Sequence, residues 1–402
     1  MTVNKNINNY FLFLFSIIPL TIVLGPTVSL VNIILIDISF LILIIYNRNF
    51  DFIKDKSIFY LLLLYLYLIF NSFISIDFYE GFYRNFGFIR IIILFAAFNF
   101  FFVQSDFYRK VFKFWSLIIF VVIIDVLIES FFGRNIFGFS GYQGRIVSFF
   151  KDEPIVGGFL FGFYLLIIGF LMSEYKENQL MIFFLMILFM LVIFITGERS
   201  NSIKSLLALC LFLLFINSIN IKKKILILLA ISTLMLVSIF NPFAKKEFLK
   251  HRYGIVKLTN IDNVYFKAYS YGFEIFKNYK LFGVGNKNYR LEACKLENIK
   301  KYNNLCNTHP HQIYFELLSE HGIIGSLIII FIMFKLVFSK ITSTLNSSKY
   351  LKLGSLIYIM LVFLPLLPGG AFFSNYLLTI FAINLSIFYA LDKKLNIFRN
   401  KD

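Results

Sequence analysis

The feature that most constrains the fold of this chain is a series of apolar runs that recur along nearly its whole length. Most are long enough, at about 17 to 25 residues, to cross roughly 30 Å of hydrocarbon as a helix. With 59% hydrophobic and 15% charged residues, a soluble globule would expose large apolar patches. The sequence therefore predicts an all-α polytopic membrane protein with about twelve transmembrane helices. The predicted spans are 10–27, 28–46, 57–75, 88–103, 112–132, 154–172, 180–196, 202–218, 223–240, 320–338, 351–368 and 374–391.

These runs divide the chain into three parts: nine spans in 1–240, a long loop in 241–319, and three spans with a polar tail in 320–402. A loop of this length is uncommon and usually functional. Part of it has apolar residues at three- to four-residue spacing, which predicts a helix. These residues are Val264, Ala268, Tyr271, Ile275 and Tyr279. The following Phe282-Gly283-Val284-Gly285 step predicts a turn, and this interpretation is favoured over a phosphate-binding loop.

Basic residues predict the orientation of the spans. If the N-terminus is cytoplasmic, the inner segments hold 19 of the 39 Lys and Arg residues and the short outer loops hold seven. The rest lie in 241–313, which is too long for the positive-inside rule to apply strongly. Both termini are therefore expected to be cytoplasmic and the long loop to lie outside. The net charge of +17 reflects this asymmetry and a lysine-rich loop near anionic headgroups, and it gives no support for nucleic-acid binding.

Four of the arginines on the outer side, which run against the charge bias, are candidates for binding an anionic substrate because a guanidinium makes bidentate contacts to phosphate. They are Arg84, Arg134, Arg145 and Arg199. The alternative is that each snorkels to the interface or pairs with a neighbour such as Glu80, Asp152 or Glu198.

The outer side also carries the sequence Thr308-His309-Pro310-His311-Gln312, followed by Gly322 and Gly325. Pro310 is expected to open a helix with Thr308 or His309 near its cap, which would put His311 in the first turn. The positive end of the helix dipole would then keep His311 neutral and available as a base. Gly322 is expected to end or bend this helix. The alternative is that His311 only hydrogen-bonds at the membrane surface.

Two cysteines of the outer loop, Cys294 and Cys306, can pair in an oxidising compartment and so hold the segment before Thr308. A zinc site formed by these cysteines with His309 and His311 is the less favoured alternative, because the spacing matches no common zinc motif.

The string His311-Gln312, nine residues, Gly322, two residues, Gly325 resembles the signature of the bacterial O-antigen ligase family. The wider superfamily includes O-antigen polymerases and protein O-oligosaccharyltransferases. Three further segments are similar: Gly144-Arg145 to Gly158, Gly197-Glu198-Arg199, and Phe282 to Gly285. Together these segments cover the chain from about residue 140 to 330.

This resemblance implies a GT-C-type glycosyltransferase of the bacterial inner membrane with a periplasmic active site. The donor would be a glycan on undecaprenyl pyrophosphate, and the acceptor a glycan or lipid A core. Arg145 and Arg199, with Arg84 or Arg134, would hold the pyrophosphate, and His311 would deprotonate the acceptor hydroxyl. His309, Gln312, Gly322 and Gly325 would support the site. The transfer would invert the anomeric centre without a metal or other cofactor.

Two alternatives remain open at this level. An O-antigen polymerase, which joins repeat units, would differ from a ligase mainly in its acceptor. A polysaccharide transporter or flippase would also have about twelve spans, and Asp37, Asp125 and Glu129 lie within or near spans. The chain has no evident repeat, and an enzyme explains the histidine-bearing loop more simply.

Overall fold

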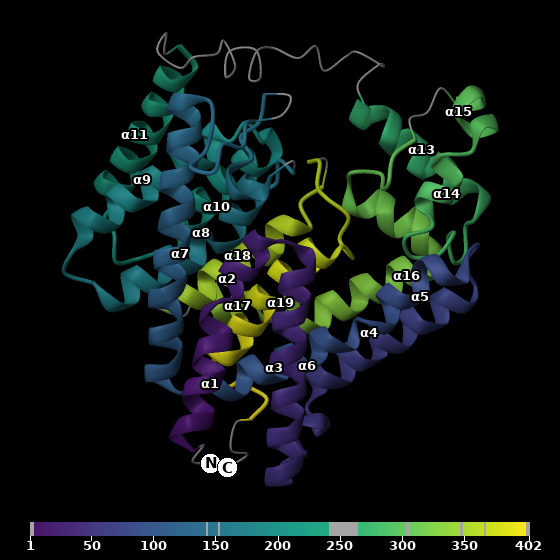
Figure 1. The fold of residues 1–402 in the computed structure, drawn as a ribbon, viewed down its shortest axis with the longest axis horizontal. Helices are drawn as coiled ribbons and strands as arrows, with labels where there is room; N and C mark the ends of the chain where they lie inside the picture. The colour runs from purple at the N-terminus through teal and green to yellow at the C-terminus, as the bar shows by residue number, and fades with distance from the viewer. Residues whose placement is uncertain are drawn as a thin grey trace.

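The computed structural model describes residues 4–141, 144–151, 153–240, 264–302, 306–345, 349–365 and 367–398. In these residues the regular structure is helical, as predicted (Figure 1). The α-helices are α1 (Lys5–Ser16), α2 (Ile18–Leu24), α3 (Pro26–Asn47), α4 (Lys56–Phe73), α5 (Phe78–Phe86), α6 (Ile89–Phe101), α7 (Ser105–Phe132), α8 (Val156–Glu174), α9 (Gln179–Ile195), α10 (Arg199–Phe215), α11 (Ile221–Phe240), α13 (Val264–Asn278), α14 (Tyr289–Ala293), α15 (Leu296–Tyr302), α16 (Ile313–Leu336), α17 (Ile341–Leu345), α18 (Tyr350–Val362) and α19 (Asn375–Ala390). Short 3₁₀ turns form at η1 (Asp51–Lys54), η2 (Ser148–Phe150) and η3 (Phe338–Lys340).

Among the described helices, six stretches are long and apolar enough to cross a membrane, or seven if the bent pair α1 and α2 is one span. The six are α3, α4, α5 with α6, α7, α8, and α16 extended to Lys340. Three shorter apolar helices, α9, α18 and α19, accompany them. The chain is thus a multi-pass membrane protein, and the number of twelve spans stays a prediction.

Helix α8 lies at the centre of the bundle. In its span, 83% of the residues are buried inside the protein, because α9, α10, α18 and α19 pack around it. The closest approach depends on glycine: a Cβ at Gly169 would lie 2.9 Å from the backbone of Tyr350, and one at Gly354 would lie 2.6 Å from Leu165 O. Small residues allow this close packing between apolar helices, where the hydrophobic effect gives little selectivity.

The long loop contains a helical unit beside α16 and α5 (Figure 1). The predicted helix is confirmed as α13, whose Ala268, Tyr271 and Ile275 are buried. Tyr271 and Ile275 pack with Val284, Tyr289 and Ala293 in a small core separate from that of the bundle. Residues 241–263, the first part of the predicted loop, lie outside the described residues. Helix α16 begins at Ile313, inside the predicted loop range, and continues past Gly322 into the predicted span.

A backbone junction attaches this helical unit to α16. Gly322 has φ 62° and ψ −167° and interrupts α16, as predicted. At this point Val284 N donates to Ser319 O at 2.9 Å and Gly285 N to Glu320 O at 2.9 Å. Both Gly283 and Gly322 must lack a side chain, because a Cβ atom at either position would overlap the backbone of the opposite segment. The N–H groups of the Gly-Val-Gly step therefore bind protein carbonyls and are not a phosphate cradle.

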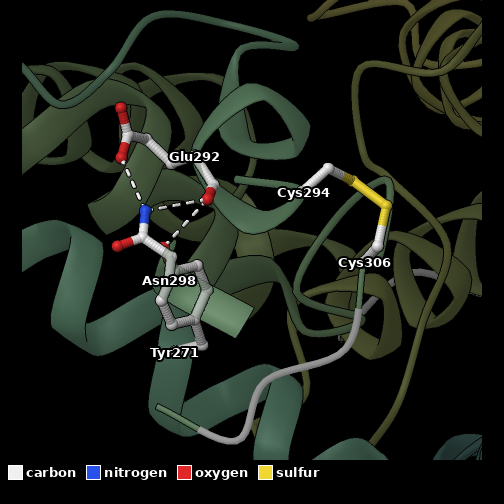
Figure 2. Close-up of a disulfide and its surroundings, with 5 residues drawn as sticks. All are labelled: Tyr271, Glu292, Cys294, Asn298 and Cys306. Carbon is white, nitrogen blue, oxygen red and sulfur yellow. Dashed lines mark hydrogen bonds between the residues drawn. A yellow bond between two sulfur atoms is a disulfide. The ribbon is translucent and has the colours of Figure 1, made fainter. Parts of the chain in front are cut away.

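Cys294 and Cys306 form a disulfide (Figure 2). Beside it Glu292 fixes the end of α14: its carbonyl accepts from Tyr271 Oη and from Asn298 Nδ2, both at 3.0 Å. The disulfide encloses α15 and holds Cys306 two residues before Thr308. The segment that leads to the histidines is thereby anchored to the helical unit.

The first turn of α1 and the segment after α19 lie at the same end of the bundle, at the bottom of Figure 1. The unit α13 to α15 lies toward the opposite end. This arrangement is the one that two termini on the same side of a membrane require.

Candidate functional site

The histidine segment ends where α16 begins, and the cap differs from the prediction. Gln312 is the N-cap, because its Oε1 accepts from the N–H groups of Tyr314 at 2.8 Å and Phe315 at 3.0 Å. His311 lies before the cap in the left-handed region, with φ 59°. The expectation that Pro310 opens the helix and that His311 lies in its first turn is wrong. Glutamine with its longer side chain takes the capping role that usually belongs to Ser, Thr, Asp or Asn.

The two histidines of the segment lie side by side. Their ring centroids are 4.1 Å apart, and the Tyr265 ring meets the His311 ring edge-on at 5.7 Å. Thr308 Oγ1 lies 3.0 Å from His309 Nδ1. His309 Nε2 is buried and has no hydrogen-bond partner among the described residues.

Both imidazoles are held neutral at neutral pH. The pKa of His309 is lowered to about 4, mainly by burial and also by the adjacent His311. Burial also lowers the pKa of His311, and the positive charge of Arg145 acts in the same direction, while the Gly369 backbone opposes both. The predicted neutrality thus has burial as its main cause, and not the dipole of α16.

A loop between α18 and α19, which the sequence reasoning did not single out, holds this segment from the other side. Gly369 N donates to His311 O at 2.7 Å. One residue earlier, Pro368 O accepts from Ser200 Oγ and, at 3.3 Å, from Lys204 Nζ of α10. The cluster of prolines and glycines between two apolar runs was the available signal. This loop therefore joins the histidine segment to the start of α10.

Arg199 is the first residue of α10, directly after the turn at Gly197. The preceding Glu198 caps α8: its carboxylate accepts from Gly157 N at 2.5 Å and Gly158 N at 3.2 Å. It also accepts from Asn201 Nδ2 at 2.7 Å. Arg199 Nε is buried and has no hydrogen-bond partner in the described part of the chain.

Arg145 lies in the loop after α7, next to the Arg199 turn. Ile146 N donates to Thr196 O at 3.0 Å, which joins the two segments. Arg145 Nε, like Arg199 Nε, is buried without a hydrogen-bond partner among the described residues. The pKa of Glu198 is raised to about 7, because the effect of burial exceeds that of the hydrogen bonds to this carboxylate and of the charge of Arg145, which both lower the pKa. Arg145 therefore acts electrostatically on both Glu198 and His311.

Two acids of α7 hold the Arg145 loop. Ser148 Oγ donates to Asp125 Oδ2 at 2.6 Å, and Ser148 N donates to Glu129 Oε2 at 2.6 Å. Asn135 Nδ2 also contacts Asp125, at 3.2 Å. These are two of the three carboxylates that the transporter alternative used, and they are occupied by loop groups. The third, Asp37, is buried and has no hydrogen-bond partner among the described residues.

Arg84 belongs to a second cluster, separate in its partners from the first. It lies on α5 in the field of Glu316 and Glu320 of α16 and of Glu80 on its own helix. These carboxylates bind other groups too: Glu316 accepts from Phe372 N at 2.9 and 3.0 Å. Glu320 accepts from Tyr289 N at 3.3 Å. The two glutamates were missed from the sequence, although their i, i+4 spacing after the histidine motif puts them on one helix face.

Of the other predicted residues, Arg134 is exposed on the loop after α7 and is not brought to the histidines by any contact in the described residues. Gly322 and Gly325 lie inside α16 and act through packing. Gly325 faces Tyr67, whose hydroxyl lies 3.2 Å from His321 Nδ1.

The cysteine ligands of the alternative zinc site are both in the disulfide. No group of three or more His, Cys, Asp or Glu residues is placed to hold a metal ion in the part of the chain that the structure describes. The arrangement instead brings together two guanidinium groups and a neutral histidine pair on joined loops. Such a site can bind an anion and accept a proton beside it.

Residues 182–330 match the protein-family model Wzy_C, described as O-Antigen ligase. The match includes Arg199, the α13 to α15 unit and the whole histidine motif through Gly325, and it confirms the resemblance that those residues carry. No curated protein matches the chain.

Proposed function

We propose that this chain, whose residues 182–330 match the O-Antigen ligase family model, belongs to the O-antigen ligase and polymerase superfamily and transfers a glycan from undecaprenyl pyrophosphate to an acceptor hydroxyl. The superfamily supports the general class, a membrane transferase that acts on lipid-linked glycans. The finer proposal rests on one observation: in the described residues the buried Nε groups of Arg145 and Arg199 have no hydrogen-bond partner, and the charge of Arg145 acts on the neutral His311.

The donor already carries its leaving group, so the site has two tasks. It must stabilise the negative charge that develops on the departing pyrophosphate, and it must take a proton from the acceptor. The two guanidinium groups suit the first task because they present several N–H donors to phosphate oxygens. Neither forms an ion pair with a carboxylate in the described residues, and the nearby Glu198, which lies in the field of Arg145, directs its carboxylate to the N–H groups of α8.

His311 suits the second task because it is neutral at neutral pH. In the proposed step the acceptor oxygen attacks the anomeric carbon from the face opposite the pyrophosphate. The new glycosidic bond forms, the carbon–oxygen bond to phosphate breaks with its electron pair, and the acceptor proton passes to His311. A single displacement of this kind inverts the anomeric configuration. The step as proposed uses only side chains of this chain as cations and requires no cofactor.

The proposed location is the bacterial inner membrane, with both termini in the cytoplasm and the site in the periplasm. Three observations support this orientation: the bias of Lys and Arg, the shared end of the bundle for α1 and the C-terminal segment (Figure 1), and the disulfide of the loop. Stable disulfides are typical of oxidising compartments such as the periplasm.

For the acceptor, the proposal is lipid A core, which makes the protein a ligase. An O-antigen polymerase, with a growing repeat unit as acceptor, is the second candidate and uses the same site. The transporter alternative loses part of its support because two of its three acids, Asp125 and Glu129, are bound to loop groups, whereas a transporter uses such acids along a pathway.

The test is incubation of the purified protein with an undecaprenyl pyrophosphate-linked oligosaccharide, with and without lipid A core, followed by sizing of the products. Attachment of one glycan to core supports the ligase. Ladders formed without core would replace it with the polymerase. Absence of transfer to either acceptor, in protein shown to be folded by its thermal transition, would contradict both.

A further inference from the structure

A cavity of about 260 Å³ lies where α2 meets α3, between the segment 149–155 and the first residues of α19. His311, Arg145 and Arg199 are not among its lining residues. Arg90 of α6 does line the cavity, which we therefore call the Arg90 pocket. It is adjacent to the candidate site, because Tyr376 lines it and its hydroxyl donates to Ile155 O, one residue before α8, at 3.0 Å.

The wall of the Arg90 pocket on the side of α2 and α3 is apolar. Ile22, Leu24, Leu30 and Ile33 form it, and Phe149 and Phe150 continue it on the opposite side. Leu24 is 59% exposed. The wall therefore reaches the outer surface of a helix pair that is predicted to face lipid. An apolar chain lying along that surface can reach the pocket without crossing a polar layer.

The polar side of the pocket carries an incompletely used guanidinium. Arg90 Nη2 donates to Asn375 Oδ1 at 2.9 Å. Its Nε is buried and has no hydrogen-bond partner among the described residues. The carboxyl of Asp37 acts on Arg90 only through its field, because neither oxygen of Asp37 has a hydrogen-bond partner there. The guanidinium therefore brings a positive charge to the lining of the pocket, and no carboxylate is hydrogen-bonded to it in the described residues.

Two exposed charges of opposite sign complete the lining. Lys151 and Glu153 both line the pocket and lie at its edge. Among the described residues that line the pocket, Arg90 and Lys151 are positively charged and Glu153 is negatively charged. A cavity with an apolar wall and a guanidinium that no carboxylate of the described residues hydrogen-bonds is complementary to an anionic headgroup attached to a hydrocarbon chain.

We propose that the Arg90 pocket binds the phosphate of a membrane amphiphile that carries a single phosphate, with the first methylene groups of its chain against Ile22 and Leu30. The cavity is too small for a whole lipid chain, so the rest of the chain lies outside along α2 and α3. The ligand comes from one of two sources, an acyl-chain phospholipid or a polyprenyl monophosphate. The proposal does not depend on glycan transfer and stands or fails separately from it.

The experiment measures binding of three probes to the full-length protein in detergent by native mass spectrometry. The probes are dioleoyl phosphatidate, undecaprenyl monophosphate and, as an uncharged control, dioleoylglycerol. Arg90→Gln is expected to weaken binding of a phosphate probe at least tenfold, which corresponds to about 1.4 kcal/mol. Arg109→Gln is the matched control, because it removes the same charge at a place outside the pocket, where Arg109 pairs with Glu174.

Two rim variants make the test independent of any folding defect in Arg90→Gln. Lys151→Gln is expected to weaken phosphate binding and Glu153→Gln to strengthen it, whereas a general loss of structure changes both in the same direction. Preference for phosphatidate identifies a membrane phospholipid, preference for undecaprenyl monophosphate identifies the carrier lipid, and equal binding shows recognition of the phosphate alone. Equal effects of Arg90→Gln and Arg109→Gln, or equal binding of dioleoylglycerol, would overturn the proposal.

Discussion

Two arginine clusters on loops and helix ends of this protein differ in what surrounds the guanidinium groups. Arg84 lies among carboxylates, in the field of Glu316, Glu320 and Glu80. Arg145 and Arg199 have buried Nε groups with no hydrogen-bond partner in the described residues. Arg84 is in the field of three carboxylates, whereas Arg145 is in that of Glu198, whose oxygens already accept from α8. A charge that several protein carboxylates balance serves the fold, whereas a less balanced cation is available to a ligand. The four outer arginines of the sequence are therefore not equivalent.

The largest effect is expected at His311, on which the charge of Arg145 acts. His311→Ala should lower the rate of glycan transfer by about 10² to 10⁴-fold, because it removes the proposed general base. His309→Ala is the comparison, since it removes the adjacent ring but leaves His311 in place, and it should cause a smaller loss. Product formation over time with excess donor measures both. Equal losses would remove the distinction between the two histidines.

The next largest effect is expected at Arg145 and Arg199. Arg145→Gln and Arg199→Gln should each raise the KM for the lipid-linked donor by about tenfold or more, because each removes charged hydrogen bonds to phosphate. Lysine at either position should restore only part of the affinity, since an ammonium is a point charge and cannot make the bidentate contact. The KM for the acceptor should stay unchanged, and a change confined to the acceptor would contradict the assignment.

Arg84 should behave in the opposite way. Arg84→Gln should change the donor KM less than about twofold but lower the melting temperature, because it leaves buried glutamates without their compensating charge. Thermal unfolding followed by intrinsic fluorescence measures the second effect. A donor defect as large as that of Arg145→Gln, at normal stability, would place Arg84 with the ligand-binding arginines and end the comparison.

The smallest effect is a shift in pH dependence. His311 acts when neutral, and its pKa lies below the ordinary value of 6.5 because burial and Arg145 disfavour the imidazolium. The acidic limb of kcat/KM should therefore have its midpoint below pH 6.5. Arg145→Gln removes one of the two causes, so the pKa of His311 should rise and the limb should move to higher pH. Arg145→Lys keeps the charge and should leave the limb in place.

The sequence predicted the helical class, the α13 helix and the bend at Gly322, because each follows from local rules of apolar spacing or glycine conformation. It did not predict the capping role of Gln312, since the expectation gave Pro310 the start of the helix. The α18–α19 loop and Glu316 were missed for a different reason: their contacts with the histidine segment and with Phe372 join residues about 60 positions apart in the chain. Pairings at that distance depend on how the helices pack.

The sequence also could not show which of the arginines are compensated by carboxylates of the protein. Arg84 and Arg199 each lie within a few residues of a glutamate, Glu80 and Glu198, so local pairing was an equal expectation for both. In the structure Glu80 binds Arg290 at 2.5 Å and Lys287 at 3.4 Å, and Glu198 caps α8. The partner that matters for Arg84 is on α16, more than 200 residues later.

The junction at Gly283 and Gly322 is made by backbone atoms, with hydrogen bonds from Val284 N and Gly285 N to α16 carbonyls. Because no side chain of the helical unit takes part in these bonds, they do not restrict which residues the unit presents on its exposed surface. The outward side chains of α13 to α15 can therefore be exchanged without detaching the unit. For protein engineering this makes the unit a replaceable module, in which a new acceptor surface can be built on an unchanged attachment.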